Sequence, residues 1–229
     1  MTAETAATQN PADSGRAARL FLVRHGEFPS NTRGLLDTTV PGELLTDRGR
    51  EQAAGAAERL AELGCTVTAV HHSPAARARN TAEIIGAGLG LGPVEVPGVF
   101  EVQAGELEKR GDAEALAAYR AVTHAWMGGD DLETGLTGGE TGIEVRDRAF
   151  PQLEKLYREH VAQGRDAVLV IHGTLIRVLG GMLGVVSGEF AAGHPIPNCG
   201  IVPLVPAGTG ELAGAASWTV EDWAGTAPA

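Results

Sequence analysis

The chain has 229 residues, with 18 lysines and arginines against 29 aspartates and glutamates, and a formal net charge of -11. Because nucleic acids and anionic membrane surfaces bind basic proteins, this acidic excess argues against both as partners. No apolar run reaches the roughly 20 residues of a membrane span and no secretory signal is recognisable, so we expect a cytoplasmic protein. Cys65 and Cys199 stand far apart, and no Cys or His spacing predicts a zinc site.

Short apolar runs alternate along the chain with segments of helical periodicity. We predict strands at residues 20–23, 66–70, 94–96, 167–171, 201–205 and 217–220. We predict helices at residues 46–63, 73–85, 113–127, 141–161 and 174–183. Ser73-Pro74 is expected to open the second helix, and Pro151 is expected to kink the fourth. This order predicts an α/β fold of three layers, α/β/α, with a mostly parallel central sheet.

The length suits a single domain, which we place at residues 19–222. Residues 1–18 are polar and rich in alanine and threonine, so they are expected to form a disordered tail. Residues 223–229 are expected to fray. Residues 106–140 break the alternation of strands and helices, and we predict that they form a small helical cap over the end of the sheet.

Chemically active side chains follow four of the predicted strands. In chain order they are Arg24-His25-Gly26-Glu27, His71-His72-Ser73 with Arg77 in the next helix, Glu101, and His172-Gly173. Each of them taken alone is more often a structural residue. Because ligands bind outside the carboxyl ends of parallel strands, we expect the set to converge on one site.

Two histidines, two arginines and a carboxylate suit transfer of a phosphoryl group through histidine. The planar fork of arginine matches the geometry of phosphate, and a neutral imidazole can attack phosphorus. A carboxylic acid can protonate the leaving alkoxide and then take a proton from the attacking water. This scheme requires neither a metal ion nor another cofactor.

Several short motifs occur in a fixed order. They are R-H-G-E from Arg24 with Asn31, L-T-x-x-G-x-x-Q-A from Leu45, S-P-x-x-R-A-x-x-T-A from Ser73, E-x-x-x-G-x-x-E from Glu101, G-G-E from Gly138, V-I-H-G from Val170 with Arg177, and Asn198-Cys199. With them the chain from about Leu20 to Leu204 resembles the histidine phosphatase superfamily, the phosphoglycerate-mutase-like group, and in particular its small phosphatases. The resemblance implies a phosphoglycerate-mutase-like fold.

The resemblance also implies roles for individual residues. His25 would be the phosphorylated nucleophile and Glu101 the general acid and base, with Glu106 and Glu108 as rivals for the latter role. The residues expected to hold the phosphate are Arg24, Asn31, Arg77 and His172. Phe28 stands where the family often has threonine or serine, and we expect it to contact the substrate together with Glu27 and Gly173.

The favoured function is therefore a metal-independent phosphomonoesterase acting on a small phosphorylated molecule. The alternatives are a mutase-type phosphotransferase or a phosphoprotein phosphatase of the same superfamily, a catalytically inactive phospho-ligand binding module, and a metal hydrolase. A metal hydrolase would use His25, His71, His72 and His172. In an extended strand His71 and His72 point to opposite faces, which argues against their binding one ion. We also consider that the chain could form a homodimer.

Overall fold

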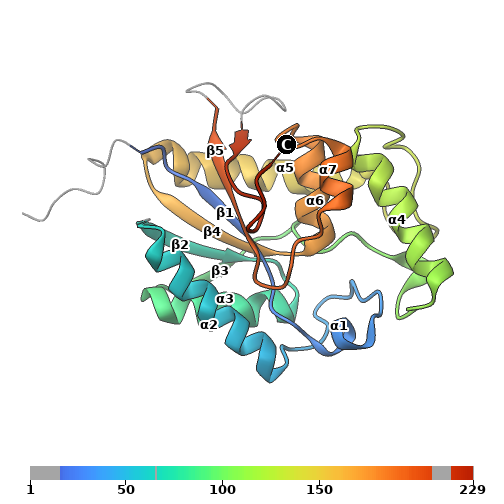
Figure 1. Cartoon of the computed structure of the whole chain (residues 1–229), viewed down its shortest axis with the longest axis horizontal. Helices are drawn as coiled ribbons and strands as arrows, with labels where there is room; N and C mark the ends of the chain where they lie inside the picture. The colour runs from blue at the N-terminus through green and yellow to red at the C-terminus, as the bar shows by residue number, and fades with distance from the viewer. Residues whose placement is uncertain (1–15, 65, 208–217, 229) are drawn as a thin grey trace, which may run out of the picture.

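The computed structural model describes residues 16–64, 66–207 and 218–228. In this part of the chain six strands form one central sheet (Figure 1). They are β1 (Leu20–Arg24), β2 (Val67–His72), β3 (Pro93–Glu95), β4 (Asp166–Ile171), β5 (Ile201–Pro206) and β6 (Trp218–Val220). Their order is β3-β2-β4-β1-β5-β6. The first four strands run parallel to one another, β5 pairs antiparallel with β1, and β6 pairs antiparallel with β5.

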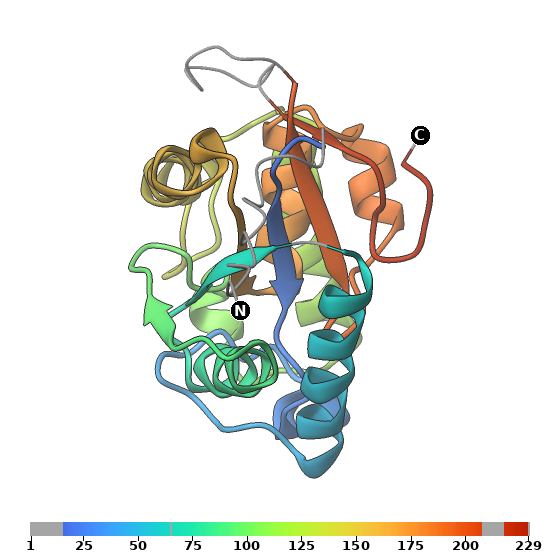
Figure 2. The ribbon, with the colours of Figure 1, turned by 90° about the vertical axis from the view of Figure 1, so that its left-hand side faces the viewer.

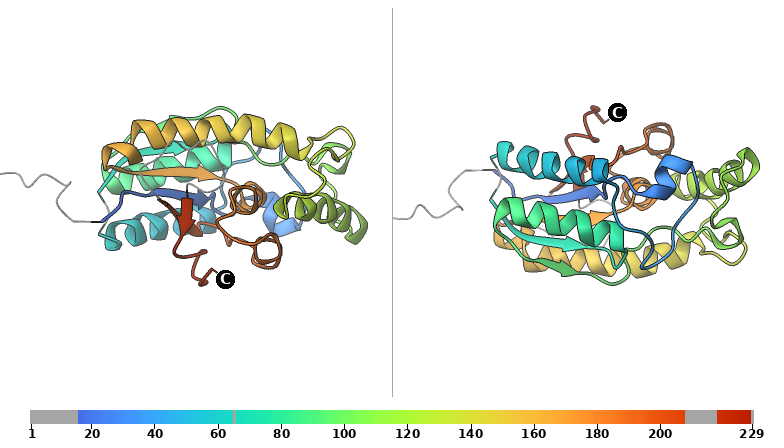
Figure 3. Two further views of the ribbon diagram at one scale, coloured as in Figure 1. Left: turned by 90° about the horizontal axis from the view of Figure 1, so that it is seen from above. Right: turned by 90° about the horizontal axis from the view of Figure 1, so that it is seen from below.

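Helices cover both faces of this sheet. They are α1 (Pro29–Arg33), α2 (Asp47–Glu62), α3 (Ala76–Leu89), α4 (Ala113–Met127), α5 (Gly142–Glu159), α6 (Gly173–Met182) and α7 (Gly188–Gly193), with 3-10 turns η2 (Gly105–Leu107) and η3 (Val161–Gln163). In β1, Phe21 and Val23 pack into a core with α2 and α3, whereas Leu20 and Leu22 pack into a second core with α5 and α6. Figure 3 shows α2 and α5 on opposite sides of the strands, and α2 and α3 pack beside each other (Figure 2). The predicted three-layer α/β architecture is confirmed.

The boundaries of several elements differ from the expectation. His71 and His72 lie inside β2 rather than beyond it, and α3 begins at Ala76 rather than at Ser73-Pro74. The hydroxyl of Ser73 lies 2.7 Å from Nε2 of His172, which is far from it in the sequence. Ser73 therefore does not serve as the N-cap of α3, a position that Ala75 occupies. Helix α5 continues through Pro151.

Two short helices, α1 and α7, were not predicted from the sequence. They have five and six residues, and such segments are too short to show helical periodicity.

Both ends of the described chain are packed more closely than expected for tails. Arg16 forms an ion pair with Asp166 at 2.5 Å, and the Ala18 side chain belongs to a hydrophobic core. Trp223, expected in the fraying C-terminal segment, is buried and donates its indole N–H to the carbonyl of His194. The remainder of the expected N-terminal tail, residues 1–15, lies outside the described residues.

The order of the strands brings the predicted site together. Because β4 lies between β1 and β2, their carboxyl ends meet at one edge, with Arg24 opposite Ile171 and His72 opposite Val170. Helix α4, from the expected cap, lies beyond this end of the sheet (Figure 1). Within the described ranges, none of the helices is long and apolar enough to cross a membrane.

Candidate active site

A cavity of about 170 Å³ lies at the carboxyl ends of β1, β2 and β4. Its lining includes six residues predicted from the sequence: Arg24, His25, Phe28, Asn31, Arg77 and Glu101. The ring centroid of His172 lies 5.2 Å from that of His25, so the second histidine stands directly beside the first. Seven of the nine predicted site residues thus converge.

His25 follows β1, and its backbone N–H donates to the carbonyl of Ile171 at the end of β4. The side-chain Nδ1 lies 2.8 Å from the carbonyl oxygen of Gly26. A carbonyl can only accept, so Nδ1 carries the proton and Nε2 keeps its lone pair. Burial first, and then the charges of Arg77 and Arg24, lower the pKa of His25 well below its usual value. The imidazole is therefore neutral at physiological pH, as a nucleophile must be.

Two arginines supply buried positive charge beside His25. Arg24 donates from Nη1 to the carbonyl of Ile196 at 2.7 Å, and Arg77 donates from Nη1 to the carbonyl of Thr39 at 3.2 Å. The Arg77 guanidinium also lies 4.8 Å from the ring centre of Phe28.

Further N–H groups of these arginines are buried without a partner among the described residues. They are Nε of Arg24 and both Nε and Nη2 of Arg77. Buried donors almost always find an acceptor, and the oxygens of a phosphate group would supply such acceptors here.

His172 contributes a further buried nitrogen of this kind. Its Nε2 lies 2.7 Å from the hydroxyl of Ser73, whereas its Nδ1 has no partner in the described part of the chain. Burial and then the charge of Arg77 lower the pKa of His172 well below its usual value. A neutral ring that accepts at Nε2 carries its proton on Nδ1, and that N–H can donate to an anion.

The Glu101 carboxylate is held by three backbone N–H groups. It accepts from Val102 at 2.9 Å, from Thr174 at 3.1 Å and from Leu175 at 2.9 Å. Thr174 and Leu175 belong to the first turn of α6, where the unpaired N–H groups of a helix favour a negative charge. The carboxylate is thus fixed at the wall of the cavity that holds His25.

Arg148 of α5 forms hydrogen bonds with the backbone of the loop that carries Glu101. Arg148 donates to the carbonyls of Gly98 at 2.7 Å and Phe100 at 2.9 Å, and it forms an ion pair with Glu140 at 2.6 Å. Glu140, from the G-G-E motif, in turn accepts the N–H of Gln103. These contacts set the path of the loop and with it the position of Glu101.

Glu106 and Glu108, the rivals of Glu101, are not among the residues that line the cavity. The carboxylate of Glu108 accepts both the N–H and the hydroxyl of Thr38. Glu106 is exposed to solvent.

Asn31 lines the cavity and is held by Asn198, from the last of the sequence motifs. Asn198 donates from Nδ2 to the Asn31 side-chain oxygen and to the backbone carbonyl of His25, at 3.1 Å in each case. The next residue, Cys199, donates its N–H to the carbonyl of Arg24 at 3.0 Å. The Asn198-Cys199 turn thereby fixes the backbone at Arg24 and His25.

Two residues expected at the substrate do not line the cavity. Glu27 accepts the hydroxyl hydrogen of Thr46 at 2.9 Å, at the start of α2. At Gly173 a Cβ would lie 3.1 Å from Cδ and Nε of Arg24, so the glycine makes room for that arginine.

The remaining lining residues were not predicted as site residues: Leu35, Leu36, Asp37, Thr38, Tyr119 and Thr174. Tyr119 lies in α4, where helical spacing is typical of a core residue. It is indeed buried, yet it also reaches the cavity and donates its hydroxyl hydrogen to the carbonyl of Val102 at 2.9 Å. Residues 35–38 lie in an irregular loop, where no periodicity signals a contact with a ligand.

His71 does not join the other histidines. Its Nε2 lies 3.0 Å from Nε2 of His160, at the end of α5. The set of four histidines considered for a metal hydrolase is therefore not assembled around this cavity.

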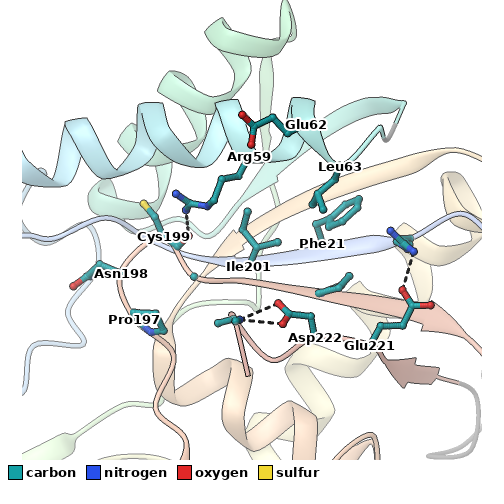
Figure 4. A pocket seen from close by; sticks show the side chains of 15 residues that line it. Phe21, Arg59, Glu62, Leu63, Pro197, Asn198, Cys199, Ile201, Glu221 and Asp222 are labelled. Atoms are coloured by element: carbon teal, nitrogen blue, oxygen red, sulfur yellow. Dashed lines mark hydrogen bonds and ion pairs between the residues drawn. The ribbon is translucent and has the colours of Figure 1, made fainter. Parts of the chain in front are cut away.

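A larger hollow of about 680 Å³ lies elsewhere, between α2, β5 and the C-terminal segment (Figure 4). Phe21 and Ile201 lie among its lining, and Arg59 donates to the carbonyl of Cys199 at its edge. It contains none of the residues predicted for catalysis or phosphate binding, so we place the active site in the smaller cavity.

Comparison with known proteins gives a consistent result. The family model described as "Histidine phosphatase superfamily (branch 1)" matches residues 20–216. Glucosyl-3-phosphoglycerate phosphatase of Mycolicibacterium vanbaalenii is 34% identical over 174 residues, which cover 72% of this chain and 73% of that protein. Metal-independent phosphoserine phosphatase of Arabidopsis thaliana is 32% identical over 165 residues, covering 70% and 66%.

The PE-PGRS family protein PE_PGRS11 of Mycobacterium tuberculosis is 30% identical over 227 residues, which cover 93% of this chain but only 37% of that protein's length. Among solved structures, a mycobacterial glucosyl-3-phosphoglycerate phosphatase in complex with VO3 superposes with a TM-score of 0.73 at 25% identity, covering 92% of this chain and 100% of that one.

Proposed function

This chain belongs to the histidine phosphatase superfamily and is a hydrolase of phosphoric monoesters, and we propose that it hydrolyses a small phosphorylated metabolite through a phosphohistidine on His25, without a metal ion. The observation that carries this proposal is the neutral, buried imidazole of His25 beside guanidinium groups with unpartnered N–H donors. The cavity of about 170 Å³ suits a small molecule, and two of the relatives are named as phosphatases of small metabolites.

In the first step the phosphate of the substrate binds to Arg24, Arg77 and His172, whose unpartnered N–H groups donate to its oxygens. Asn31, fixed by Asn198, lies at the same wall of the cavity. These donors offset the negative charge on the phosphate oxygens and orient the ester for attack.

Nε2 of His25 then attacks phosphorus, since its lone pair is free while Nδ1 donates to Gly26. The P–N bond forms and the ester P–O bond breaks. The leaving alkoxide takes a proton from Glu101 in its acid form, and the alcohol departs.

Water completes the reaction. Glu101, now a carboxylate, takes a proton from the water as its oxygen attacks phosphorus. The P–N bond breaks, inorganic phosphate leaves, and His25 returns to the neutral form, with Glu101 protonated for the next turnover.

The test is to trap the intermediate. Rapid acid-free quenching of the protein with a radiolabelled aryl phosphate should give a phosphoprotein that is labile in acid and stable in alkali, and His25→Ala should give none. Turnover that proceeds in His25→Ala, or that ceases in the presence of a metal chelator, would overturn the proposal. Product analysis with 3-phosphoglycerate separates a phosphatase, which releases free phosphate, from a mutase, which isomerises the ester.

A further inference from the structure

The walls of the active-site cavity differ in charge, and we propose that this difference defines the substrate: the alcohol that leaves carries no carboxylate. The substrate would be the phosphate ester of a neutral or amine-bearing alcohol, rather than of a hydroxy acid such as glycerate or serine. This inference rests on the proposed phosphatase function and extends it to the leaving group.

The described residues that line the cavity include two cations, Arg24 and Arg77, and two anions, Asp37 and Glu101. Both arginines are needed for the phosphate, whose dianion matches their two charges. A carboxylate on the leaving group would require a third cation, and the lining offers none among these residues.

Asp37 adds an ionised carboxylate to this wall, with the ammonium of Lys109 as its counter-ion. Its side chain is fully buried and accepts from Ser30 at 2.6 Å, from Thr39 at 2.7 Å and from the ammonium of Lys109. Burial opposes ionisation, but the hydrogen bonds from Lys109, Ser30 and Thr39 outweigh it and lower the pKa of Asp37 to about 2. The group therefore stays ionised throughout the neutral range.

Glu108 places a further carboxylate behind the wall, bound to the N–H and hydroxyl of Thr38. Burial lowers the pKa of Arg77, and the charges of Glu101, Asp37 and Glu108 act in the opposite direction, which shows that these carboxylates lie near the guanidinium. An anionic leaving group would thus enter a region where carboxylates already surround the guanidinium, and like charges repel strongly where water is excluded.

Three cations from the neighbouring segments have carboxylate partners. Lys109 contacts Asp37, Arg110 pairs with Asp112 at 2.8 Å, and Arg33 pairs with Glu43 at 2.9 Å. Turning Lys109 toward a substrate would leave the buried carboxylate of Asp37 without its counter-ion, which is strongly unfavourable.

The rest of the wall presents apolar groups or polar groups that are already bonded. Leu35 and Leu36 contribute carbon, and Tyr119 donates its hydroxyl hydrogen to Val102. Burial and the nearby Glu101 raise the pKa of Tyr119 well above its usual value, so this phenol stays neutral. Such a wall fits an uncharged leaving group.

Two pairs of substrates test the inference on the full chain, and in each pair one member carries a carboxylate where the other has a hydroxymethyl group or a hydrogen. The pairs are 3-phosphoglycerate with glycerol 3-phosphate, and phosphoserine with phosphoethanolamine. We expect the member without the carboxylate to have a kcat/KM about tenfold higher or more in each pair. For an ester that is not turned over, its Ki against p-nitrophenyl phosphate hydrolysis replaces kcat/KM.

A substitution in the wall gives a second, independent readout. Leu35 lines the cavity, is partly exposed and belongs to neither hydrophobic core. Leu35→Lys should shift the ratio of the two kcat/KM values toward the carboxylate-bearing member, and Leu35→Met should leave it unchanged.

If the unaltered chain hydrolyses p-nitrophenyl phosphate but has equal kcat/KM values for the two members of each pair, the inference about the leaving group is wrong. A higher kcat/KM for the hydroxy-acid ester would overturn it in the same way. Loss of that hydrolysis itself would instead refute the proposed function. The two failures are thus distinguishable.

Discussion

The hydroxyl of Ser73 at the end of β2 lies 2.7 Å from Nε2 of His172 at the end of β4. Both residues are fully buried, and the hydroxyl oxygen also accepts the N–H of Ala75 at 3.3 Å. When this hydroxyl donates to Nε2, the proton of His172 lies on Nδ1, the nitrogen without a partner among the described residues. Ser73 then positions His172, which we propose binds the phosphate.

Ser73→Ala should weaken the binding of phosphate. Without the hydroxyl, His172 loses the partner that fixes its tautomer, and one hydrogen bond of this kind corresponds to about tenfold in affinity. The measurement is the Ki of inorganic phosphate. Ser187→Ala, which removes the cap of the distant helix α7, is the matched control and should leave this Ki unchanged. An unaltered Ki in Ser73→Ala would contradict the assignment.

Glu101→Gln should distinguish between substrates by their leaving groups. The amide oxygen can still accept from Val102 and Leu175, which share one oxygen of Glu101, but the bond from Thr174 is lost and the side chain can no longer deliver a proton. Alkyl phosphates should lose roughly 10²–10⁴-fold in kcat, whereas p-nitrophenyl phosphate, whose phenolate leaves unaided, should lose far less. Glu106→Gln, at an exposed position on the same segment, should affect neither. Equal losses for both substrates would remove Glu101 from the role of general acid.

The charge of Arg77 should govern the protonation of His25. Burial and then Arg77 and Arg24 hold the pKa of His25 well below its usual value, so the imidazole should remain neutral below pH 6.5. Removing a nearby cation makes the imidazolium less unfavourable, and Arg77→Gln should therefore shift the pKa upward. NMR titration of the ring in the free protein measures this directly. The exposed Arg50→Gln on α2 should cause no shift, and an equal shift in both variants would contradict the electrostatic cause.

The convergence of His25, Arg77 and His172 could be predicted from the sequence because each follows a strand of one parallel sheet, and parallel strands place their carboxyl ends at one edge. The position of Glu101 could not be separated from those of Glu106 and Glu108 in this way. The path of its loop depends on Arg148 and Glu140, about 40 residues away in the chain. The same holds for Tyr119, whose helical spacing reports its burial but not the cavity at the end of its side chain.

His71 and His160 should make the fold sensitive to acid. Burial and then the charges of His160 and Lys155 lower the pKa of His71 to about 4, while an unfolded chain binds the proton near pH 6.5. Stability is therefore complete above about pH 6.5 and decreases as the pH falls toward 4, because the unfolded state binds more protons. For this one group the loss at pH 5 is about 1–2 kcal/mol.

His71→Gln should unfold with a smaller dependence on pH between 7 and 5, as measured by urea denaturation at each pH. An identical pH dependence in the variant and the unaltered chain would show that His71 is protonated in the folded state as easily as in the unfolded one.

Gly173→Ala should impair catalysis without removing any functional group. The new Cβ would lie 3.1 Å from Cδ and Nε of Arg24, which is closer than ordinary van der Waals contact, so the arginine side chain must move. Because misplacing a transition-state contact by a fraction of an ångström is costly, we expect kcat/KM for an aryl phosphate to fall by about tenfold. Gly193→Ala at the end of α7 is the matched control, since its Cβ would meet nothing within 4 Å. If both alanine variants retain full activity, the space at Gly173 is not needed to keep the Arg24 guanidinium in place. The unpartnered Nε of Arg24 is then not positioned for the phosphate.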